Sequence, residues 1–222
     1  MRRLNRMEPE PVNQIDKVRA GYDRIAPTFL RIRRSSGPDI ELLAELTDRL
    51  SNGARVLDAG CGAGVPVARL LADRFQVTGV DLSASQIELA RSLVPDATFI
   101  QADMTTIELS DNSFDAICSF YAIIHVPREQ HPTLLERFHR MLVPGGYLLA
   151  SMGATDNPTD RDDDWLGAGA AMYWSHYDRE ANLRMVSAVG FEIVWERLVR
   201  EDEAFGSGSH LFLLARKPHG SH

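Results

Sequence analysis

A glycine-rich turn between a short apolar strand and a helix constrains this chain more than any other feature of its sequence. The strand is predicted over 55–59, and the turn over 60–64 has the spacing G-x-G-x-G. Glycines there let the backbone turn sharply and let a ligand approach the main-chain amides. Val65 replaces the last glycine of the dinucleotide fingerprint G-x-G-x-x-G. Asp81 ends the next predicted strand, at the spacing expected of an acid that binds a ribose.

The apolar periodicity alternates between strand and helix along most of the chain. Strands that alternate with helices of this length predict βαβ units and an α/β fold around a buried parallel sheet. Ser83 and Gln86 have the spacing of a capping box at the start of one helix. We expect helices over 15–27, 39–50, 65–75, 83–94, 128–142 and 178–189, and strands over 55–59, 76–81, 98–101, 114–120, 147–151, 191–200 and 210–216.

Length and composition favour one globular domain. The chain has 222 residues, below the roughly 250 at which single cores begin to split. A net charge of −7 disfavours nucleic acid as the main partner. Cys61 and Cys118 lie in apparent core segments, which favours free thiols in a reducing cytoplasm. No stretch has the apolar length of a membrane span or of a secretory signal. We therefore expect a cytoplasmic protein with a flexible N-terminus over 1–14, one domain over 15–222 and no membrane partner.

Five sequence blocks occur together in one order. They are VLDAGCGAG at 56–64, VTGVDLS at 77–83, QADM at 101–104, SFDAICSFYAIIHV at 113–126 and LVPGGYLLAS at 142–151. In these blocks the chain resembles the class I S-adenosylmethionine-dependent methyltransferases, from about Tyr22 to the C-terminus. The resemblance implies a Rossmann-like, seven-stranded, mostly parallel sheet with an antiparallel last strand and helices on both faces. It also implies an N-terminal helical cap over 15–52.

The resemblance further implies S-adenosyl-L-methionine as cofactor and assigns its contacts to named positions. Asp58 and the turn over 60–64 should hold the methionine and sugar end, and Asp81 should hold the ribose diol. The Phe120 carbonyl should accept a hydrogen bond from the methionine ammonium. Tyr22 belongs to an N-terminal element that covers the cofactor in many small-molecule members. From the residues alone, Asp58 is also compatible with a turn cap and Tyr22 with the core face of a helix.

The adenine end of the cofactor is assigned in the same way. Leu82 should pack on the adenine, and Asp103 and the Met104 amide should bind its polar edge. An alternative for Asp103 is to cap a short helix that begins near Thr105. The complete set of expected cofactor-binding residues is Tyr22, Asp58, Gly60, Cys61, Gly62, Gly64, Asp81, Leu82, Gln86, Ala102, Asp103, Met104 and Phe120.

Methyl transfer from a sulfonium is an in-line displacement, so the protein mainly aligns the acceptor and excludes water. A base is needed only where the attacking atom carries a proton. His125, just past the strand over 114–120, and His176 are the candidate bases, because imidazole can take a proton near neutral pH. The alternative for His125 is packing against the cofactor or capping the turn before Pro127.

A long segment over 152–176 interrupts the alternation of strands and helices and is predicted to be a functional loop. It follows the fifth strand, beside the expected crevice, and it concentrates aromatic residues. We expect it to form the acceptor wall and to be more mobile than the sheet; the alternative is that it covers the core. The aspartate-rich run over 160–164 lacks the spacing of a calcium loop, so no metal site is expected. The expected substrate-binding residues are Tyr121, Trp165, Met172, Tyr173 and Trp174.

The sequence leaves several questions open. The expected partner is a small-molecule acceptor, but its identity, the attacking atom (oxygen, nitrogen or carbon) and the choice between monomer and homodimer are not determined. A nicotinamide-dependent oxidoreductase shares the glycine turn and the acid, although the third fingerprint glycine and a Tyr-x-x-x-Lys motif are missing. A non-catalytic module that binds S-adenosylmethionine is the other alternative. The negative net charge and the lack of an Asn-Pro-Pro-Tyr-like motif argue against a nucleic-acid methyltransferase.

Overall fold

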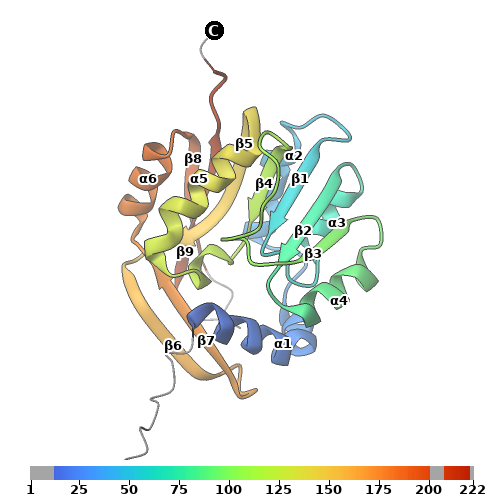
Figure 1. The fold of residues 1–222 in the computed structure, drawn as a ribbon, viewed down its shortest axis with the longest axis vertical. Helices are drawn as coiled ribbons and strands as arrows, with labels where there is room; N and C mark the ends of the chain where they lie inside the picture. The colour runs from blue at the N-terminus through green and yellow to red at the C-terminus, as the bar shows by residue number, and fades with distance from the viewer. Residues whose placement is uncertain (1–12, 201–207, 221–222) are drawn as a thin grey trace, which may run out of the picture.

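The computed structural model describes residues 13–200 and 208–220, and its centre is a seven-stranded sheet (Figure 1). Its strands are β1 (Arg55–Ala59), β2 (Gln76–Asp81), β3 (Thr98–Gln101), β4 (Phe114–Ser119), β5 (Leu142–Gly153), β8 (Glu192–Arg200) and β9 (Ser209–Arg216). The strand order is β3-β2-β1-β4-β5-β9-β8. Neighbours from β3 to β5 are parallel, whereas β9 is antiparallel to both β5 and β8. The predicted Rossmann-like fold with an antiparallel last strand is confirmed.

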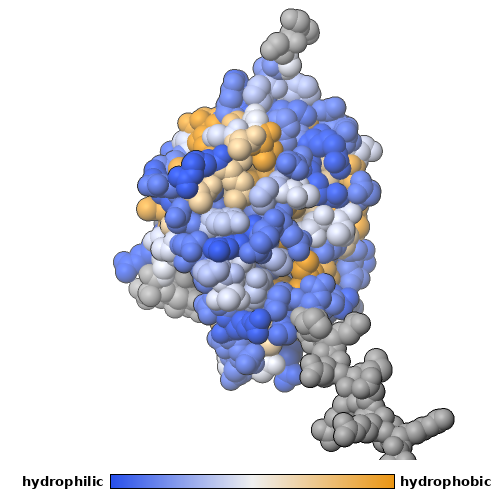
Figure 2. All heavy atoms as spheres, turned by 60° about the vertical axis from the view of Figure 1, so that its left-hand side comes forward, coloured by the Kyte–Doolittle hydropathy of each residue, from blue (hydrophilic) through white to orange (hydrophobic). Residues whose placement is uncertain are grey.

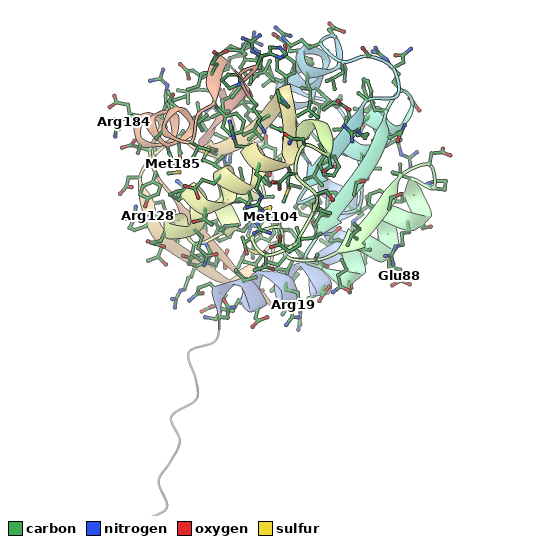
Figure 3. The ribbon with its side chains drawn as sticks, turned by 45° about the horizontal axis from the view of Figure 1, so that its top comes forward. Arg19, Glu88, Met104, Arg128, Arg184 and Met185 are labelled. Atoms are coloured by element: carbon green, nitrogen blue, oxygen red, sulfur yellow. The ribbon has the colours of Figure 1, made fainter. Side chains whose placement is uncertain are left out.

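Helices cover both faces of the sheet. One face packs against α2 (Pro38–Thr47), α3 (Val67–Ala72) and α4 (Ala84–Leu93), and the other against α5 (His131–Met141) and α6 (Arg179–Ala188). Two short 3₁₀ helices, η1 (Ile123–His125) and η2 (Arg128–Gln130), precede α5. Glu88 of α4 and Arg184 of α6 extend outward from these layers (Figure 3). The result is a three-layer arrangement of helices, sheet and helices.

Neighbouring residues of each central strand pack into opposite layers. In β1, Val56 joins the core on the side of α2 to α4, and Leu57 joins the core on the side of α5 and α6. In β9, Leu214 and Leu213 divide in the same way. Because both faces are covered, these strands are mostly apolar and carry no regular alternation of apolar and polar residues.

The first helix is longer than predicted. α1 (Gln14–Ile32) passes through Pro27, near which we expected the helix to end. Proline removes one backbone donor and usually stops or kinks a helix. Ile25 and Ala26, just before it, are fully buried, so tertiary packing holds this part of the helix in place. Residues 1–12 of the predicted flexible N-terminus lie outside the described residues, and α1 already begins at Gln14.

Residues 157–176 form a β-hairpin, so the prediction of a loop over 152–176 is wrong in its secondary structure. β5 extends to Gly153, and β6 (Asn157–Trp165) pairs antiparallel with β7 (Ala170–His176) in a separate two-stranded sheet. β6 is exposed along nearly all of its length and rich in aspartate. It therefore lacks the alternation of apolar residues that indicates a strand, and its pairing with β7 defines it.

α1 packs along β7, so the helix and the hairpin form one wall (Figure 1). Val18 and Ile25 of the helix contact the buried cluster that contains Met172 and Tyr173. A Cβ atom at Gly21 would lie 2.6 Å from the carbonyl oxygen of Ala171. A glycine at this position therefore lets the helix approach the strand closely.

Hydrophobic side chains are concentrated in three buried clusters between these elements. The face in Figure 2 is mostly hydrophilic, with small and separate hydrophobic patches. Within residues 13–200 and 208–220, no helix combines the length and the apolar character needed to cross a membrane.

Candidate functional site

The glycine turn and the end of β4 meet at the middle of the sheet. The strand order reverses between β1 and β4, and open α/β sheets bind ligands at the carboxyl ends of the strands at such a reversal. Gly60 follows β1 with a φ of +81°. A Cβ atom there would lie 2.1 Å from the Cβ atom of Ala122, which follows β4. The absence of a side chain at Gly60 is therefore what lets the two loops touch.

Asp81, at the end of β2, holds the glycine turn against the start of α4. Its Oδ2 accepts a hydrogen bond from the Gly62 amide at 2.8 Å, and its Oδ1 accepts one from the Ser83 amide at 2.9 Å. Burial raises the pKa of Asp81, and these amide hydrogen bonds act in the opposite direction. A substitution of Asp81 would therefore loosen the turn as well as remove a carboxylate.

Ser83 caps α4 and also connects it to α1. Its Oγ accepts a hydrogen bond from the Gln86 amide at 3.1 Å and donates to Oδ1 of Asp23 at 2.6 Å. In a full capping box the Gln86 side chain would accept a hydrogen bond from the Ser83 amide. Here that amide donates to Asp81 instead. The Gln86 side chain is thereby left for another role.

Two buried side chains beside the turn carry polar atoms without a hydrogen-bond partner in the described part of the chain. These atoms are Oδ2 of Asp58 and both polar atoms of the Gln86 amide. Burial, and then the negative charge of Asp81, raise the pKa of Asp58 to about 7. Buried polar atoms are almost always hydrogen bonded, so these atoms fit a polar ligand in the crevice.

A cavity in this crevice brings together nearly all the residues predicted to bind the cofactor. Gly64 is not among its lining residues: a Cβ atom there would meet the Phe99 and Val94 side chains at 3.0 and 3.2 Å. This glycine therefore serves the packing of the turn against β3 and α4. The predicted residues that do line the cavity are Tyr22, Asp58, Gly60, Cys61, Gly62, Asp81, Leu82, Gln86, Ala102, Asp103, Met104 and Phe120.

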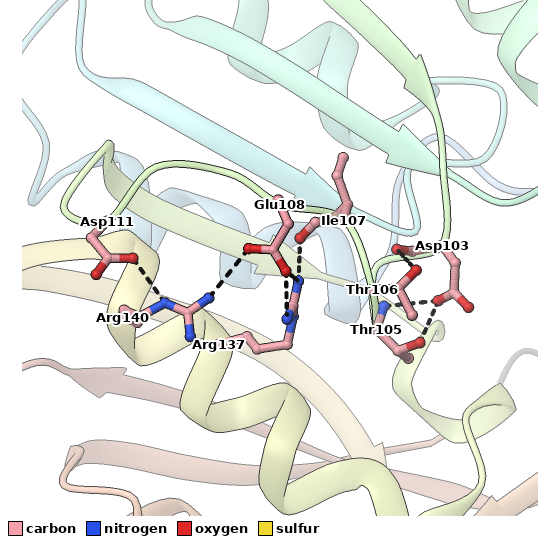
Figure 4. A network of polar contacts seen from close by, with 8 residues as sticks. All are labelled: Asp103, Thr105, Thr106, Ile107, Glu108, Asp111, Arg137 and Arg140. Atoms are coloured by element: carbon pink, nitrogen blue, oxygen red, sulfur yellow. Dashed lines mark hydrogen bonds and ion pairs between the residues drawn. The ribbon is translucent and has the colours of Figure 1, made fainter.

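Asp103 borders this cavity and also caps a turn at Thr105. Its Oδ1 accepts hydrogen bonds from the amide and the hydroxyl of Thr105, at 2.8 and 2.7 Å (Figure 4). The other carboxylate oxygen points away from Thr105 in Figure 4. The same segment is tied to α5 by an ion pair between Arg137 and Glu108 at 3.3 Å.

His125 is hydrogen bonded at both ring nitrogens. Nδ1 lies 2.7 Å from the Tyr173 carbonyl oxygen, and Nε2 lies 2.9 Å from the Tyr22 hydroxyl oxygen. A carbonyl oxygen only accepts hydrogen bonds, so Nδ1 carries the proton and Nε2 accepts from the Tyr22 hydroxyl. Burial lowers the pKa of His125 to about 4, and the imidazole is therefore neutral at physiological pH.

Tyr22 and His125 also border a second cavity of about 380 Å³, a volume typical of small-molecule sites. Phe29, Trp165 and Trp174 line it as well. The centroid of the Tyr22 ring lies 5.4 Å from that of Phe29 and 5.8 Å from that of Trp165. The Trp165 and Trp174 centroids lie 5.7 Å apart, and all three pairs pack edge to face. Such contacts hold the aromatic wall in one arrangement.

Besides Gly64, three predicted residues line neither cavity. His176 lies at the end of β7, where its Nδ1 is 2.7 Å from the Thr155 carbonyl oxygen, so the structure does not support its prediction as a base. Met172 and Tyr173 are buried against α1, and Tyr173 contributes its backbone carbonyl to His125. These two side chains are therefore part of the core.

Several polar residues of the second cavity, Arg33 and Asp39 among them, are missing from the sequence predictions. Arg33 donates to Oδ2 of Asp39 at 3.0 Å, and the hydroxyl of Tyr121, a predicted residue, donates to the same oxygen at 3.1 Å. All three line this cavity, and Arg33 and Tyr121 also line the first. The prediction that the helix ends near Pro27 hid Arg33, because α1 extends to Ile32 and carries the next residue to the cavity.

The fold and the first cavity define a class of protein, the Rossmann-like α/β domains that bind a nucleoside cofactor where the strand order reverses. Residues 56–146 match the family model described as a methyltransferase domain. Phosphoethanolamine N-methyltransferase 3 of Arabidopsis thaliana is 34% identical over 163 residues, which are 70% of this chain and 32% of that protein. Malonyl-[acyl-carrier protein] O-methyltransferase of Enterobacter lignolyticus (strain SCF1) is 34% identical over 157 residues, 68% of this chain and 60% of that protein.

Among solved structures, the 1,6-didemethyltoxoflavin-N1-methyltransferase of Burkholderia thailandensis, with bound 1,6-didemethyltoxoflavin and S-adenosylhomocysteine, has a similar fold. The TM-score is 0.72 at 21% identity, over 97% of this chain and 93% of that one. The chain belongs to the class I S-adenosylmethionine-dependent methyltransferases, whose cofactor is S-adenosylmethionine. It spans 32–60% of the lengths of the two relatives named above. These matches favour the methyltransferase prediction over the nicotinamide-dependent oxidoreductase.

Proposed function

We propose that this chain transfers a methyl group from S-adenosylmethionine to a small molecule held in the second cavity. The observation that carries the proposal is the shared wall: Tyr22 and His125 border both the cavity at the glycine turn and the aromatic-lined cavity. An acceptor in the second cavity would thus lie next to a cofactor in the first. Similar proteins named for phosphoethanolamine and for 1,6-didemethyltoxoflavin support a small acceptor.

The proposal gives the cofactor polar contacts from the ends of three strands. Asp58 near the end of β1 and the Phe120 carbonyl after β4 would hold the methionine end, and the unpaired Oδ2 of Asp58 suits an ammonium group. Asp81 keeps acceptor capacity for the ribose diol, because a carboxylate has about four lone-pair sites and amides use two of them. Leu82 and Asp103 border the region proposed for the adenine. When bound, S-adenosylmethionine supplies an electrophilic methyl group.

Tyr22 and His125 would carry a proton away from an acceptor that attacks through an O–H or N–H group. The Tyr22 oxygen would accept that proton while its own proton moves to Nε2 of His125. The Tyr173 carbonyl fixes the tautomer by accepting from Nδ1–H, and it continues to accept when the ring is charged. The base predicted at His125 therefore acts through Tyr22.

The direct test is methyl transfer itself. Incubation with methyl-labelled S-adenosylmethionine and a metabolite extract should give a labelled small molecule that mass spectrometry identifies. The non-catalytic alternative predicts binding of S-adenosylhomocysteine without any labelled product.

Cofactor binding should release protons near neutral pH. Asp58 has a pKa of about 7, so its carboxyl is half protonated at pH 7. A ligand ammonium nearby would lower that pKa and favour the ionised form. The affinity for S-adenosylhomocysteine should therefore rise between pH 6 and 8, with release of about half a proton at pH 7. Calorimetry in two buffers of different ionisation enthalpy measures this release, which Asp58→Asn should remove; equal heats in both buffers would contradict the assignment.

Trp174→Ala and Tyr173→Ala should separate acceptor binding from core packing, although the two residues are neighbours in β7. Trp174 lines the second cavity, so its loss should raise the acceptor KM several-fold or lower turnover, with cofactor affinity unchanged. Tyr173 is buried, and the alanine variant keeps the backbone carbonyl that His125 uses. Its loss should lower stability by about 3–5 kcal/mol and spare the KM of the folded enzyme. Unchanged kinetics in Trp174→Ala would favour the alternative that the hairpin only covers the core.

A further inference from the structure

We propose that the acceptor carries an anionic group, a carboxylate or a phosphate, which Arg33 and Arg200 bind while the apolar part of the acceptor lies against Trp165 and Trp174. This inference rests on the proposed function, because it takes the second cavity to be the acceptor site. It names the chemical class of molecule that the cavity selects.

The described lining of the second cavity has more cationic than acidic side chains, although the whole chain is acidic. That lining contains three arginines, Arg33, Arg34 and Arg200, and one acid, Asp39, whereas the chain has a net charge of −7. His125 adds no charge, because burial lowers its pKa to about 4. These arginines and Asp39 are the charged residues of the described lining, and residues 201–207 lie outside the described residues. A cleft lined by one sign of charge concentrates ligands of the opposite sign.

Arg33 is held rigidly at this cavity. Its side chain is 12% exposed, and it pairs with Asp39, whose side chain is 11% exposed, at 3.0 Å. The guanidinium also lies over the Tyr121 ring, 5.0 Å from the ring centroid. One hydrogen bond to Asp39 leaves further donors on the planar group, which has five. A fixed guanidinium suits two parallel hydrogen bonds to a carboxylate or a phosphate.

Asp39 does not cancel this preference for anions. Its Oδ2 already accepts from both Arg33 and the Tyr121 hydroxyl. A cationic acceptor would have to compete with Arg33 for this carboxylate and would also meet Arg200. An anionic acceptor would instead add a second partner to Arg33 without breaking the pair.

Arg200 brings a second cation to the cavity from the other end of the chain. It ends β8 and is exposed, whereas Arg33 follows α1 and is largely buried. The cavity therefore has one largely buried cation, Arg33, and two exposed ones, Arg34 and Arg200, an arrangement that draws an anion inward. Trp165 and Trp174 supply the apolar surface beside it.

The test measures binding to the protein saturated with S-adenosylhomocysteine. The probes are 3-hydroxybenzoate, 3-hydroxyphenyl phosphate and the neutral 3-hydroxybenzamide. We expect the anion that binds more tightly to have at least about tenfold higher affinity than the amide. Whether that anion is the benzoate or the phosphate shows which group the cavity recognises. Arg200→Gln should reduce this preference several-fold, with the affinity for the amide unchanged. Arg33→Lys keeps the pair with Asp39 but loses the planar fork, and should also reduce the preference.

The matched control is Arg184→Gln, because Arg184 is exposed, extends outward from α6 and lines neither cavity (Figure 3). This variant should keep the full preference for the anion. The proposal is overturned if the amide binds as tightly as both anions, if no probe binds, or if the preference is unchanged in both Arg200→Gln and Arg33→Lys. Each of these results would overturn only the anionic acceptor. If the proposed function itself is wrong, the cofactor titration or the labelled methyl transfer will fail instead.

Discussion

Gly62→Val is expected to weaken binding of S-adenosylhomocysteine by at least about 100-fold, or about 2.7 kcal/mol, in a protein that still folds. Gly62 has a φ of +52°, and the nearest atom to a Cβ there is Oε1 of Gln86 at 3.8 Å. A valine side chain would therefore project into the cavity without meeting the core. The left-handed backbone conformation adds a strain of about 1–3 kcal/mol. Calorimetric titration measures the affinity, and circular dichroism checks the fold.

Gly53→Val is the matched control for this change. Gly53 has a φ of +79°, and a Cβ there would have no atom within 4 Å. It precedes β1, whereas the glycine turn follows that strand, so the two variants share the backbone strain but only one fills the cavity. Both variants should lose a similar amount of stability, and Gly53→Val should bind S-adenosylhomocysteine normally. Normal binding by Gly62→Val would remove the glycine turn from the cofactor site.

The sheet could be predicted because its central strands are largely buried. The predicted strands over 55–59, 76–81 and 98–101 match β1, β2 and β3 residue for residue. Continuous apolar runs bounded by turn residues carry this information locally. The reversal of strand order at β1 and β4 then places the glycine turn and Phe120 beside one cavity.

The N-terminal helix and the hairpin could not be predicted in the same way, because they stabilise each other across the chain. Pro27 is a local stop signal, yet Ile25 packs in a cluster with Met172, far away in sequence. β6 has almost no apolar face of its own. Local patterns therefore indicate a helix that ends early and a loop, whereas packing between α1 and β7 defines both elements.

The cofactor cavity was predicted more completely than the acceptor cavity for a related reason. Residues 58–64 and Asp81 are placed by short motifs attached to strand ends. In β7, by contrast, Tyr173 is core and its neighbour Trp174 lines the cavity, and no local pattern distinguishes two adjacent aromatic residues. The hydrogen bond between Tyr22 and His125 joins positions 103 residues apart, so it becomes visible only when α1 is placed over the crevice.

Tyr22→Phe and His125→Ala are each expected to lower turnover by about 10²–10⁴-fold, the usual contribution of proton transfer by a positioned group. Tyr22→Phe removes one oxygen atom and keeps the ring that packs on Phe29 and Trp165, so the affinity for S-adenosylhomocysteine should hardly change. Single-turnover kinetics with the labelled cofactor measures the chemical step. His139→Ala is the control, because His139 packs edge to face with Phe191 and lines neither cavity.

The double variant and the pH profile distinguish a proton relay from two independent contacts. If the proton passes from Tyr22 to His125, either single change breaks the relay, and the double variant should lose about as much turnover as one alone. A base works in its unprotonated form, and the pKa of His125 is lowered from 6.5 to about 4. Wild-type turnover should therefore stay level as the pH falls through 6.5 and decline only on approach to 4. Turnover in Tyr22→Phe equal to that of the wild type, or losses that multiply in the double variant, would show that the acceptor is methylated without this relay.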